Sequence, residues 1–320
     1  SRNEKIRMDK IKIAIVFSSK KNLQSVKDFC SFVRNQDAKF DFDIYFTTSL
    51  LQGIELTRSF VNRYEIIVAA GGDGTLLSVV NAAFDNSDVK ILPLPLGTSN
   101  DFARALNLNN YHNAAKALLS NQYLSVRLSQ CHVRDENDRN RMMYFCSNAG
   151  VGLLADMARL QKQQRTSSIT ELKNVFQALL HYLFYKGICG EITINNNKFV
   201  SNFLFIEMFK TQRAGPAKFA PYADLTNDVL DVVLCHDQNV WRRLHSAFRL
   251  LSKGNHIELA EIDYFSTTNS YNKFKVHHPK QISIKTKARA MVHVNGDFIG
   301  YSPCRFEITD KKMIFFHLKK

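Results

Sequence analysis

The chain has 320 residues, of which 45% are hydrophobic and 22% charged, as in an ordinary globular protein with room for two hydrophobic cores. No apolar run reaches the length that crosses a bilayer, and the charged N-terminus lacks the apolar segment of a secretory signal. The six cysteines are scattered without a C-x-x-C pair, which argues against zinc sites and disulfide frameworks. We therefore expect a reduced, cytoplasmic protein.

The formal net charge of +14 favours an anionic partner. Basic residues are not interleaved with aromatic ones as in nucleic-acid-binding signatures, so we expect a membrane surface or a nucleotide and no nucleic acid. A basic surface that only keeps the protein soluble explains the charge equally well. The sequence carries no signal for an oligomeric state.

In the first third of the chain, short apolar runs alternate with segments of helical periodicity. Strands followed by helices are typical of parallel β-α units. We therefore predict an α/β domain over residues 11–122. Its predicted strands are residues 11–17, 42–46, 66–70 and 89–96, and its predicted helices cover residues 26–33, 51–61 and 76–84.

Beyond residue 122 the pattern changes to many short strands with polar turns, which predicts an antiparallel sandwich or barrel. This second domain covers residues 123–320, and its last strand is a candidate to return to the first domain. The predicted strands are residues 123–133, 142–147, 191–194, 199–209, 229–234, 274–276, 282–285, 291–294, 305–308 and 313–317.

Two amphipathic helices, residues 172–184 and 240–251, interrupt the strands. The second carries Arg242, Arg243 and Arg249 away from its apolar face. We expect that apolar face to pack on the core with the arginines in solvent. A basic amphipathic helix lying on a membrane surface is the alternative.

The most informative segment is Gly71-Gly72-Asp73-Gly74-Thr75, which follows the apolar run at residues 66–70. Glycines let a backbone approach a ligand closely, and the free amides at a helix start favour an anion. Asp73 would repel a phosphate unless a magnesium ion lay between them or the carboxylate acted on a proton. The alternative is a tight turn in which Asp73 or Thr75 caps the next helix.

A second polar segment, Gly97-Thr98-Ser99-Asn100-Asp101, follows the predicted strand at residues 89–96. Taken alone it caps a helix as readily as it binds a ligand; beside the glycine loop it favours a phosphate site. No P-loop or protein-kinase catalytic loop is present. We interpret Gly150-x-Gly152-x-x-Ala155 as a turn into a helix and not as a dinucleotide site.

The two polar segments resemble the diacylglycerol kinase catalytic domain family, which includes bacterial lipid kinases, sphingosine kinases and ceramide kinases. The glycine-aspartate-glycine loop is shared with NAD kinases and phosphofructokinases, whereas P-L-G-T-x-N-D-F-A-R at residues 95–104 is much more specific to the lipid kinases. The likeness continues in family order through Asn81 and residues 148–152, 220–232 and 294–298.

This resemblance implies an N-terminal α/β nucleotide-binding domain, a C-terminal β-sandwich domain for the lipid, and ATP in the cleft between them. It also implies Mg²⁺ bound with ATP beside Asp73, with Asp73 and Asp297 as the catalytic residues. The residues it assigns to the nucleotide are Thr48, Gly71, Gly72, Asp73, Gly74, Thr75, Thr98, Asn100 and Asp101.

The chain departs from the family pattern at three places. Residues 16–20 (VFSSK) replace the usual Asn-Pro-x-Ser-Gly loop, and Asn295-Gly296-Asp297 replaces Asp-Gly-Glu, so the expected general base is one methylene shorter. Asn227 stands where some members have an aspartate that binds a structural magnesium ion. Because an amide oxygen carries no charge, we expect weak metal binding or none at Asn227.

The resulting hypothesis is an ATP-dependent lipid kinase of phospholipid metabolism, associated peripherally with an anionic membrane. It would transfer the γ-phosphoryl group to a hydroxyl of a lipid such as diacylglycerol or a sphingoid base. The alternatives are an NAD kinase-like enzyme and a catalytically weak homologue that binds nucleotide or lipid.

Overall fold

A computed structural model describes residues 10–18, 23–86, 88–164, 171–215, 217–252, 259, 262–266 and 278–319. The fold is a mixture of helices and strands, and strands make up most of its second half. The chain divides into two compact units, of which the first is Ser1–Val126 with Lys311–Lys320 and the second is Arg127–Asp310. None of the described helices is long and apolar enough to cross a membrane.

The first unit is built on a parallel sheet with the strand order β2-β1-β3-β4. All six residues of β3 are buried, as expected for a strand covered on both faces. The end of β14 adds a further parallel strand beside β4, with Ile314 opposite Lys90. The strands are β1 (Ile11–Phe17), β2 (Phe40–Phe46), β3 (Ile66–Gly71) and β4 (Lys90–Pro95), and β14 covers Asp297–Phe316.

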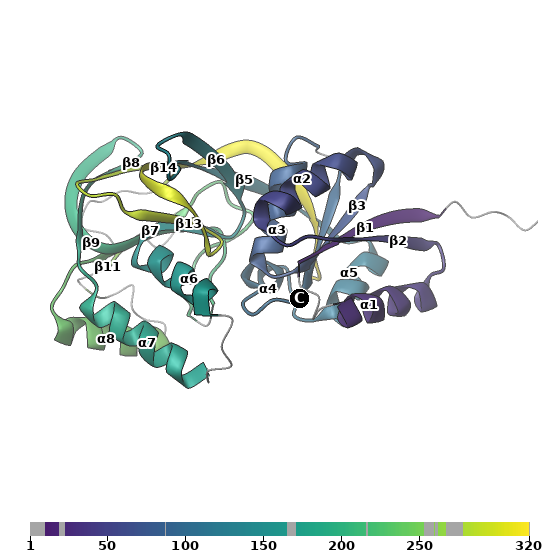
Figure 1. The fold of residues 1–320 in the computed structure, drawn as a ribbon, viewed down its shortest axis with the longest axis horizontal. Coiled ribbons are helices and arrows are strands. Elements are labelled where there is room, and N and C mark those ends of the chain that lie inside the picture. The colour runs from purple at the N-terminus through teal and green to yellow at the C-terminus, as the bar shows by residue number, and fades with distance from the viewer. Residues whose placement is uncertain are drawn as a thin grey trace, which may run out of the picture. The chain divides into compact units, whose positions relative to one another are not determined.

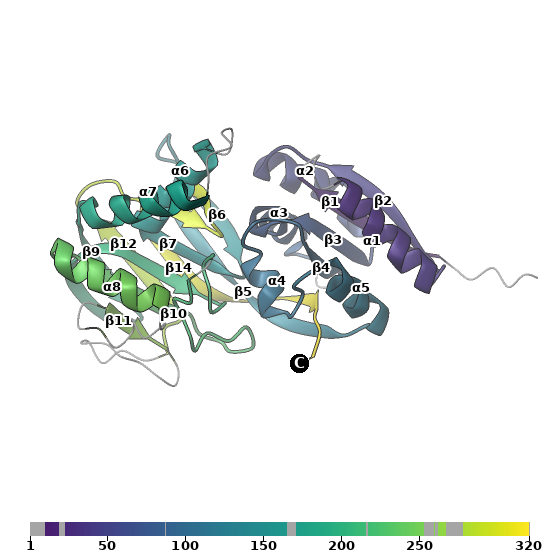
Figure 2. The same cartoon turned by 90° about the horizontal axis from the view of Figure 1, so that it is seen from below.

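Helices cover both faces of this sheet, with α2 and α3 on one side and α1 and α5 on the other (Figures 1 and 2). Helix α1 buries Val26, Phe29, Cys30 and Val33, the stripe that the sequence predicts. The helices are α1 (Leu23–Gln36), α2 (Leu50–Phe60), α3 (Asp73–Ala83), the short α4 (Asp101–Ala105) and α5 (Tyr111–Ser120), with a 3-10 turn at Val61–Arg63.

The strand order makes one end of the sheet a natural place for a ligand. Because β2 lies on one side of β1 and β4 on the far side of β3, the connections diverge between β1 and β3. Open α/β sheets bind ligands at such a switch point, beyond the carboxyl ends of the strands. The two polar segments predicted from the sequence follow β3 and β4 at this end.

In the second unit, the described strands with an assigned register pair in the antiparallel direction. Six of its strands close a ring, in the order β9-β7-β13-β14-β12-β8 and back to β9. The strands are β5 (Tyr123–Arg134), β6 (Asn140–Phe145), β7 (Asn148–Gly152), β8 (Ile188–Ile194), β9 (Asn197–Phe209), β10 (Asp231–His236), β11 (Ile262–Phe265), β12 (Gln281–Thr286) and β13 (Met291–Val294).

Helices α6 (Leu153–Gln164), α7 (Glu171–Phe184) and α8 (Val240–Ser252) belong to the second unit. Helix α6 follows directly on β7, so the expected helix after Gly152 is present, but Gly150–Gly152 are the end of strand β7 and not a turn. The predictions for α8 were wrong in two respects. Arg243 is buried instead of exposed, and the side chains of Leu244 and Phe248 are exposed instead of packed on the core.

Most other predicted elements are present with shifted ends. Two predicted strands at residues 305–308 and 313–317 are parts of the single strand β14, and the predicted strand at 274–276 lies outside the described residues. The sequence analysis missed α4, α5, β7 and β11, and it gave no bounds for the helix after Gly152, which is α6. Helices α4 and α5 are only 5 and 10 residues long, and such short elements give little periodic signal.

Candidate functional site

Four loops of the first unit leave the carboxyl ends of its four neighbouring strands. Ser18 follows β1, Thr48 lies two residues beyond β2, Gly72 follows β3 and Gly97 lies two residues beyond β4. Parallel strands bring these loops to the same edge of the sheet. The two polar segments predicted from the sequence therefore lie at the same edge of the sheet.

The glycine loop is the first turn of α3, because this helix begins at Asp73, three residues before the predicted start. Its N-cap, Gly72, makes no side-chain hydrogen bond to the first turn. The first amides of a helix have no partner within the helix and carry the positive end of its dipole. The start of α3 is therefore suited to an anion.

Asp73 joins the two polar loops. Its carboxylate accepts hydrogen bonds from the backbone amides of Asp101 at 3.2 Å and Phe102 at 3.3 Å, at the start of α4. Burial raises the pKa of Asp73, while these two amides and the nearby Arg104 act in the opposite direction. Each carboxylate oxygen has two lone pairs, so Asp73 can hold α4 and still accept another ligand.

Gly72 and Gly97 bring the loops into direct backbone contact. A β-carbon on Gly97 would lie 2.3 Å from Cα of Gly72, and one on Gly72 would lie 3.3 Å from Cα of Gly97. No side chain fits at Gly97 without moving one of the loops. The close approach of the two backbones therefore explains both glycines without reference to a ligand.

Asn100 shapes the second loop from within. Its side-chain oxygen accepts from the amide of Gly97 at 3.0 Å, and its side-chain nitrogen donates to the carbonyl of Gly97 at 2.7 Å. The backbone of Asn100 is left-handed, with φ of 51°, a conformation that asparagine tolerates better than most residues. These bonds give Asn100 a structural role, and they leave Thr98 at the exposed tip of the loop.

The loops after β1 and β2 contact their surroundings through hydroxyl groups. The Ser18 and Thr75 hydroxyls are 2.7 Å apart, so the altered first loop reaches the glycine loop. The amide and hydroxyl of Thr48 both donate to Oε1 of Gln52 at 2.7 Å. Sequence reasoning assigned no role to Ser18, Gln52 or Arg104, although Ser18 lies in the altered first loop and Arg104 in the motif at residues 95–104.

Asp297 lies in the second unit, at the start of β14 and directly after a two-residue turn. Asn295 and Gly296 form this turn with φ of 49° and 76°, as in the type I′ hairpins that Asn-Gly sequences favour. The side chain of Asp297 is 8% exposed. The departure at Asn295 therefore preserves the turn that presents Asp297.

A buried network supports this turn from below. Nδ1 of His293 accepts from the amide of Gly296 at 3.1 Å, which leaves Nε2–H to donate to Glu207. Glu207 also accepts from the side chain of Asn148 at 3.2 Å. The amide of Asn148 donates to the side-chain oxygen of Asn295 at 3.3 Å, and the amide of Asn295 donates to the carbonyl of Asn148 at 2.8 Å. Glu207 and His293 are 0% and 2% exposed, so the network fixes the backbone just before Asp297.

The ammonium group of Lys210 binds the loop that contains Asn227. Nζ of Lys210 donates to the carbonyl of Asn227 at 2.6 Å and to that of Val229 at 3.4 Å. Burial lowers the pKa of Lys210 to about 8, although nearby acidic groups such as Asp228 and Asp231 favour its charge. Among the described residues no group of three acidic, histidine or cysteine side chains could hold a metal ion. A cationic side chain therefore already lies against this loop.

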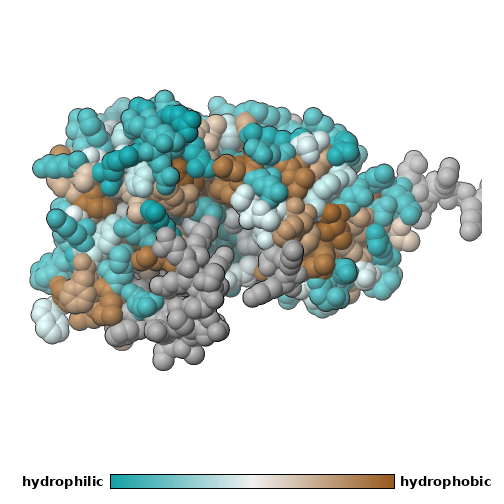
Figure 3. Space-filling model, viewed as in Figure 1, coloured by the Kyte–Doolittle hydropathy of each residue, from teal (hydrophilic) through white to brown (hydrophobic). Residues whose placement is uncertain are grey.

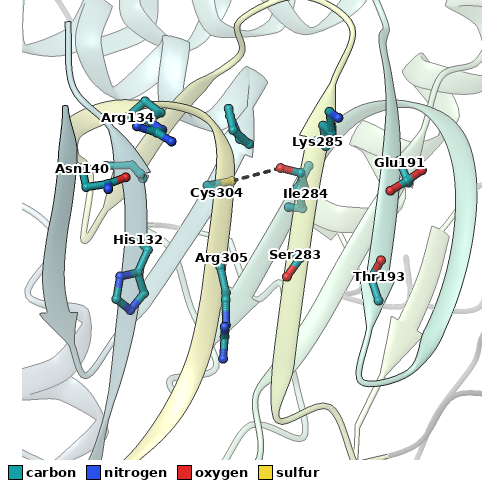
Figure 4. A pocket seen from close by; sticks show the side chains of 12 residues that line it. His132, Arg134, Asn140, Glu191, Thr193, Ser283, Ile284, Lys285, Cys304 and Arg305 are labelled. Carbon is teal, nitrogen blue, oxygen red and sulfur yellow. Dashed lines mark hydrogen bonds between the residues drawn. The ribbon is translucent and has the colours of Figure 1, made fainter. Parts of the chain in front are cut away.

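A hollow of about 320 Å³ lies on the strands of the second unit, over β5, β6, β8, β12 and β14 (Figure 4). Charged and polar side chains line much of it, including Arg134, Lys285, Arg305 and Glu191. None of the predicted site residues contributes to this hollow.

Comparison with known proteins agrees with the geometry at the sheet edge. Residues 18–131 match the family model of the diacylglycerol kinase catalytic domain. The matched range includes the loops after all four parallel strands, and the resemblance predicted from the two polar segments is confirmed.

Two relatives align with most of this chain and with most of their own length. A diacylglycerol kinase of Staphylococcus haemolyticus is 25% identical over 256 residues, which cover 79% of this chain and 71% of that protein. A diacylglycerol kinase of Staphylococcus aureus is 24% identical over 285 residues, covering 86% of this chain and 81% of that one. These matches support a lipid kinase.

Solved structures share the fold. A diacylglycerol kinase from Bacillus anthracis strain Sterne superposes with a TM-score of 0.64 at 16% identity, covering 98% of each chain. Another solved chain from the same strain gives a TM-score of 0.69 at 16% identity and covers 99% of this chain and 98% of its own.

The contact between Gly72 and Gly97 predicts graded effects of added methyl groups. Gly97→Ala should lower the free energy of unfolding by about 1–3 kcal/mol, because its methyl group overlaps Gly72. Gly72→Ala, with a 3.3 Å contact, should cost less. Urea denaturation measures both. Equal stabilities for the two variants and the wild type would show that the loops do not touch as described.

The buried Asp231 predicts a pH dependence of stability. Burial raises its pKa from 3.8 to about 6, against the hydrogen bonds from Tyr264 and Ser266. The folded state therefore holds this proton more tightly, and the stabilisation is lost as pH rises through 6. Asp231→Asn lacks this loss, so its stability relative to wild type should improve by up to about 3 kcal/mol between pH 4 and 7. The check is denaturation of both proteins at several pH values. If the free energies of unfolding of wild type and Asp231→Asn changed equally between pH 4 and 7, the prediction would be contradicted.

Proposed function

We propose that this protein is an ATP-dependent lipid kinase, which transfers the γ-phosphoryl group of ATP to a hydroxyl of a lipid such as diacylglycerol. The observation that carries the proposal is the junction of the glycine loop and the residue 97–101 loop through Asp73, at the uncapped start of α3. The family match and the named relatives support the lipid as acceptor.

The phosphates of ATP would lie against the first turn of α3, near the amides of Gly72, Asp73 and Gly74. The amide of Thr75 donates to the carbonyl of Gly72 at 3.0 Å, so Thr75 would contribute through its hydroxyl group. Thr98 at the exposed loop tip and Thr48 beyond β2 would contact other parts of the nucleotide. Arg104, close enough to Asp73 to lower its pKa, would offset the charge of the transferring group. Asn100 and Asp101 would act mainly by holding the loop.

The residues present fit a magnesium ion that is bound together with ATP. Mg²⁺ is usually held by one or two carboxylates plus substrate phosphates, not by an all-protein cage. Asp73 supplies one carboxylate with spare lone pairs beside the anion-binding turn. When bound, the ion would neutralise charge that develops on the phosphoryl oxygens.

Asp297 would act as the general base. In this step the lipid hydroxyl oxygen bonds to the γ-phosphorus, the bond from that phosphorus to the β,γ-bridging oxygen breaks, and ADP leaves. The hydroxyl proton passes to the Asp297 carboxylate. The Asn295-Gly296 turn and the bond from Gly296 to His293 would hold this carboxylate in place.

The acceptor lipid lies in a membrane, so the enzyme would work at an anionic membrane surface to which its charge of +14 attracts it. The proposal is tested with labelled ATP and a panel of phosphoryl acceptors. The panel contains the lipids diacylglycerol and sphingosine, and NAD for comparison. Transfer to a lipid supports it. Transfer to NAD alone, or ATP binding with no transfer to any acceptor, would overturn it.

Substitution of Asp73 by asparagine tests its role in phosphoryl transfer separately from its role in holding the two loops together. Asp73→Asn should reduce phosphoryl transfer by at least about a hundredfold, because a neutral amide is a weaker magnesium ligand than the carboxylate. Asp28→Asn, on the exposed side of α1, is the matched control and should leave transfer unchanged. A folded Asp73→Asn protein with full activity would remove Asp73 from the mechanism.

Asp297→Asn should lose transfer while it keeps most of its ATP affinity.

A further inference from the structure

The face of helix α8 that points to solvent is its apolar face. Trp241 is 81% exposed and Phe248 is 66% exposed, while Arg243 and Ser246 are buried on the opposite side. Val240 and Leu244 add to the exposed face. Figure 3 shows hydrophobic side chains gathered where Figure 1 places the ends of α7 and α8. Helix α8 is thus turned the opposite way from an ordinary surface helix.

This orientation is fixed by polar contacts. The Arg243 guanidinium donates to the carbonyls of Tyr182, Leu183 and Tyr185, each at 2.9 Å, and so caps the end of α7. It also donates to the carbonyl of Gln238 at 2.8 Å and pairs with Asp237. Rotation of α8 to bury its apolar face would break these bonds and leave several buried groups unpaired.

Basic groups flank the exposed apolar face. Arg242 and Arg249 are seven residues apart and therefore share one edge of α8, with His245 between that edge and Trp241. Helix α8 contains no acidic residue. Nearby, Phe184 at the end of α7 is 73% exposed and Lys186 follows it. Aromatic side chains beside basic ones are typical of helices that lie in the interface of anionic bilayers.

We propose that the exposed face of α8, formed by Val240, Trp241, Leu244 and Phe248 with Arg242, His245 and Arg249 beside it, docks the protein on an anionic lipid bilayer. This deepens the proposed lipid-kinase function, because it assigns the surface that brings the enzyme to its substrate. A second copy of the chain fits this surface less well than a bilayer. In a symmetric dimer the basic edge of one α8 would lie against the basic edge of the other, and the like charges would repel.

The chain contains a single tryptophan, so Trp241 reports on the docking surface in the unmodified protein. Vesicles of phosphatidylcholine with phosphatidylglycerol should shift its fluorescence emission to the blue and protect it from acrylamide quenching. Pure phosphatidylcholine vesicles should do so more weakly, and high salt should reduce the effect. An unchanged emission maximum with phosphatidylglycerol vesicles would overturn the proposal.

A double variant, Leu244→Ser with Phe248→Ser, keeps the fluorescent probe and should weaken vesicle binding at least about tenfold. The matched control is Leu51→Ser with Val200→Ser, which removes two comparably exposed apolar side chains from other elements and should bind as wild type. Equal binding by both double variants would contradict docking through α8. Docking through α8 would also be contradicted if the wild type formed a concentration-dependent dimer that did not bind vesicles and that the α8 double variant did not form.

Kinase assays on the same proteins keep the two proposals distinct. The α8 double variant should retain activity on short-chain diacylglycerol in detergent micelles and lose it on vesicles. Vesicle binding by wild type without transfer to any lipid would overturn the proposed function alone. Transfer in micelles by a wild-type protein that does not bind vesicles would overturn the docking proposal alone.

Discussion

The carboxylate of Asp73 accepts hydrogen bonds from two backbone amides, and these two bonds organise the loops of the first unit. The residue sits in the first turn of α3, and the amides of Asp101 and Phe102 begin α4, so one side chain ties together segments that leave neighbouring strands. The contact of Gly72 with Gly97 depends on the same approach of the two loops. An acidic residue beside amides that suit an anion is therefore not a contradiction, because its carboxylate holds the two loops together.

Much of this arrangement could be predicted from the sequence, because it depends on local patterns. Apolar runs that end in Gly71–Thr75 or Gly97–Asp101 define strand ends, and parallel strands carry those ends to one edge. The orientation of α8 could not be predicted from its periodicity, since the bonds of Arg243 to α7 carbonyls join residues about 60 positions apart. The same holds for Asp73 and Phe102, 29 positions apart, whose contact no sequence pattern reveals.

The departures from the family pattern have physical explanations in this chain. Asparagine adopts the left-handed backbone of the Asn295-Gly296 turn about as readily as aspartate, so the turn before Asp297 is kept. At Asn227 the ammonium of Lys210 binds the loop carbonyls, and a lysine with one charge needs fewer acidic ligands than a divalent ion. Ser18 in the altered first loop bonds to Thr75 of the glycine loop. None of these changes removes Asp73 or the uncapped turn of α3.

Hydrogen–deuterium exchange of the whole protein with and without magnesium ATP tests the central claim most directly. Amides at the start of a helix exchange readily unless a ligand or cap accepts their hydrogen bonds. The account predicts that magnesium ATP slows exchange in peptides that cover Gly71–Thr75 and Gly97–Phe102, with a smaller effect around Thr48. Protection confined to other segments, or no protection at saturating nucleotide, would contradict a triphosphate site at this edge of the sheet.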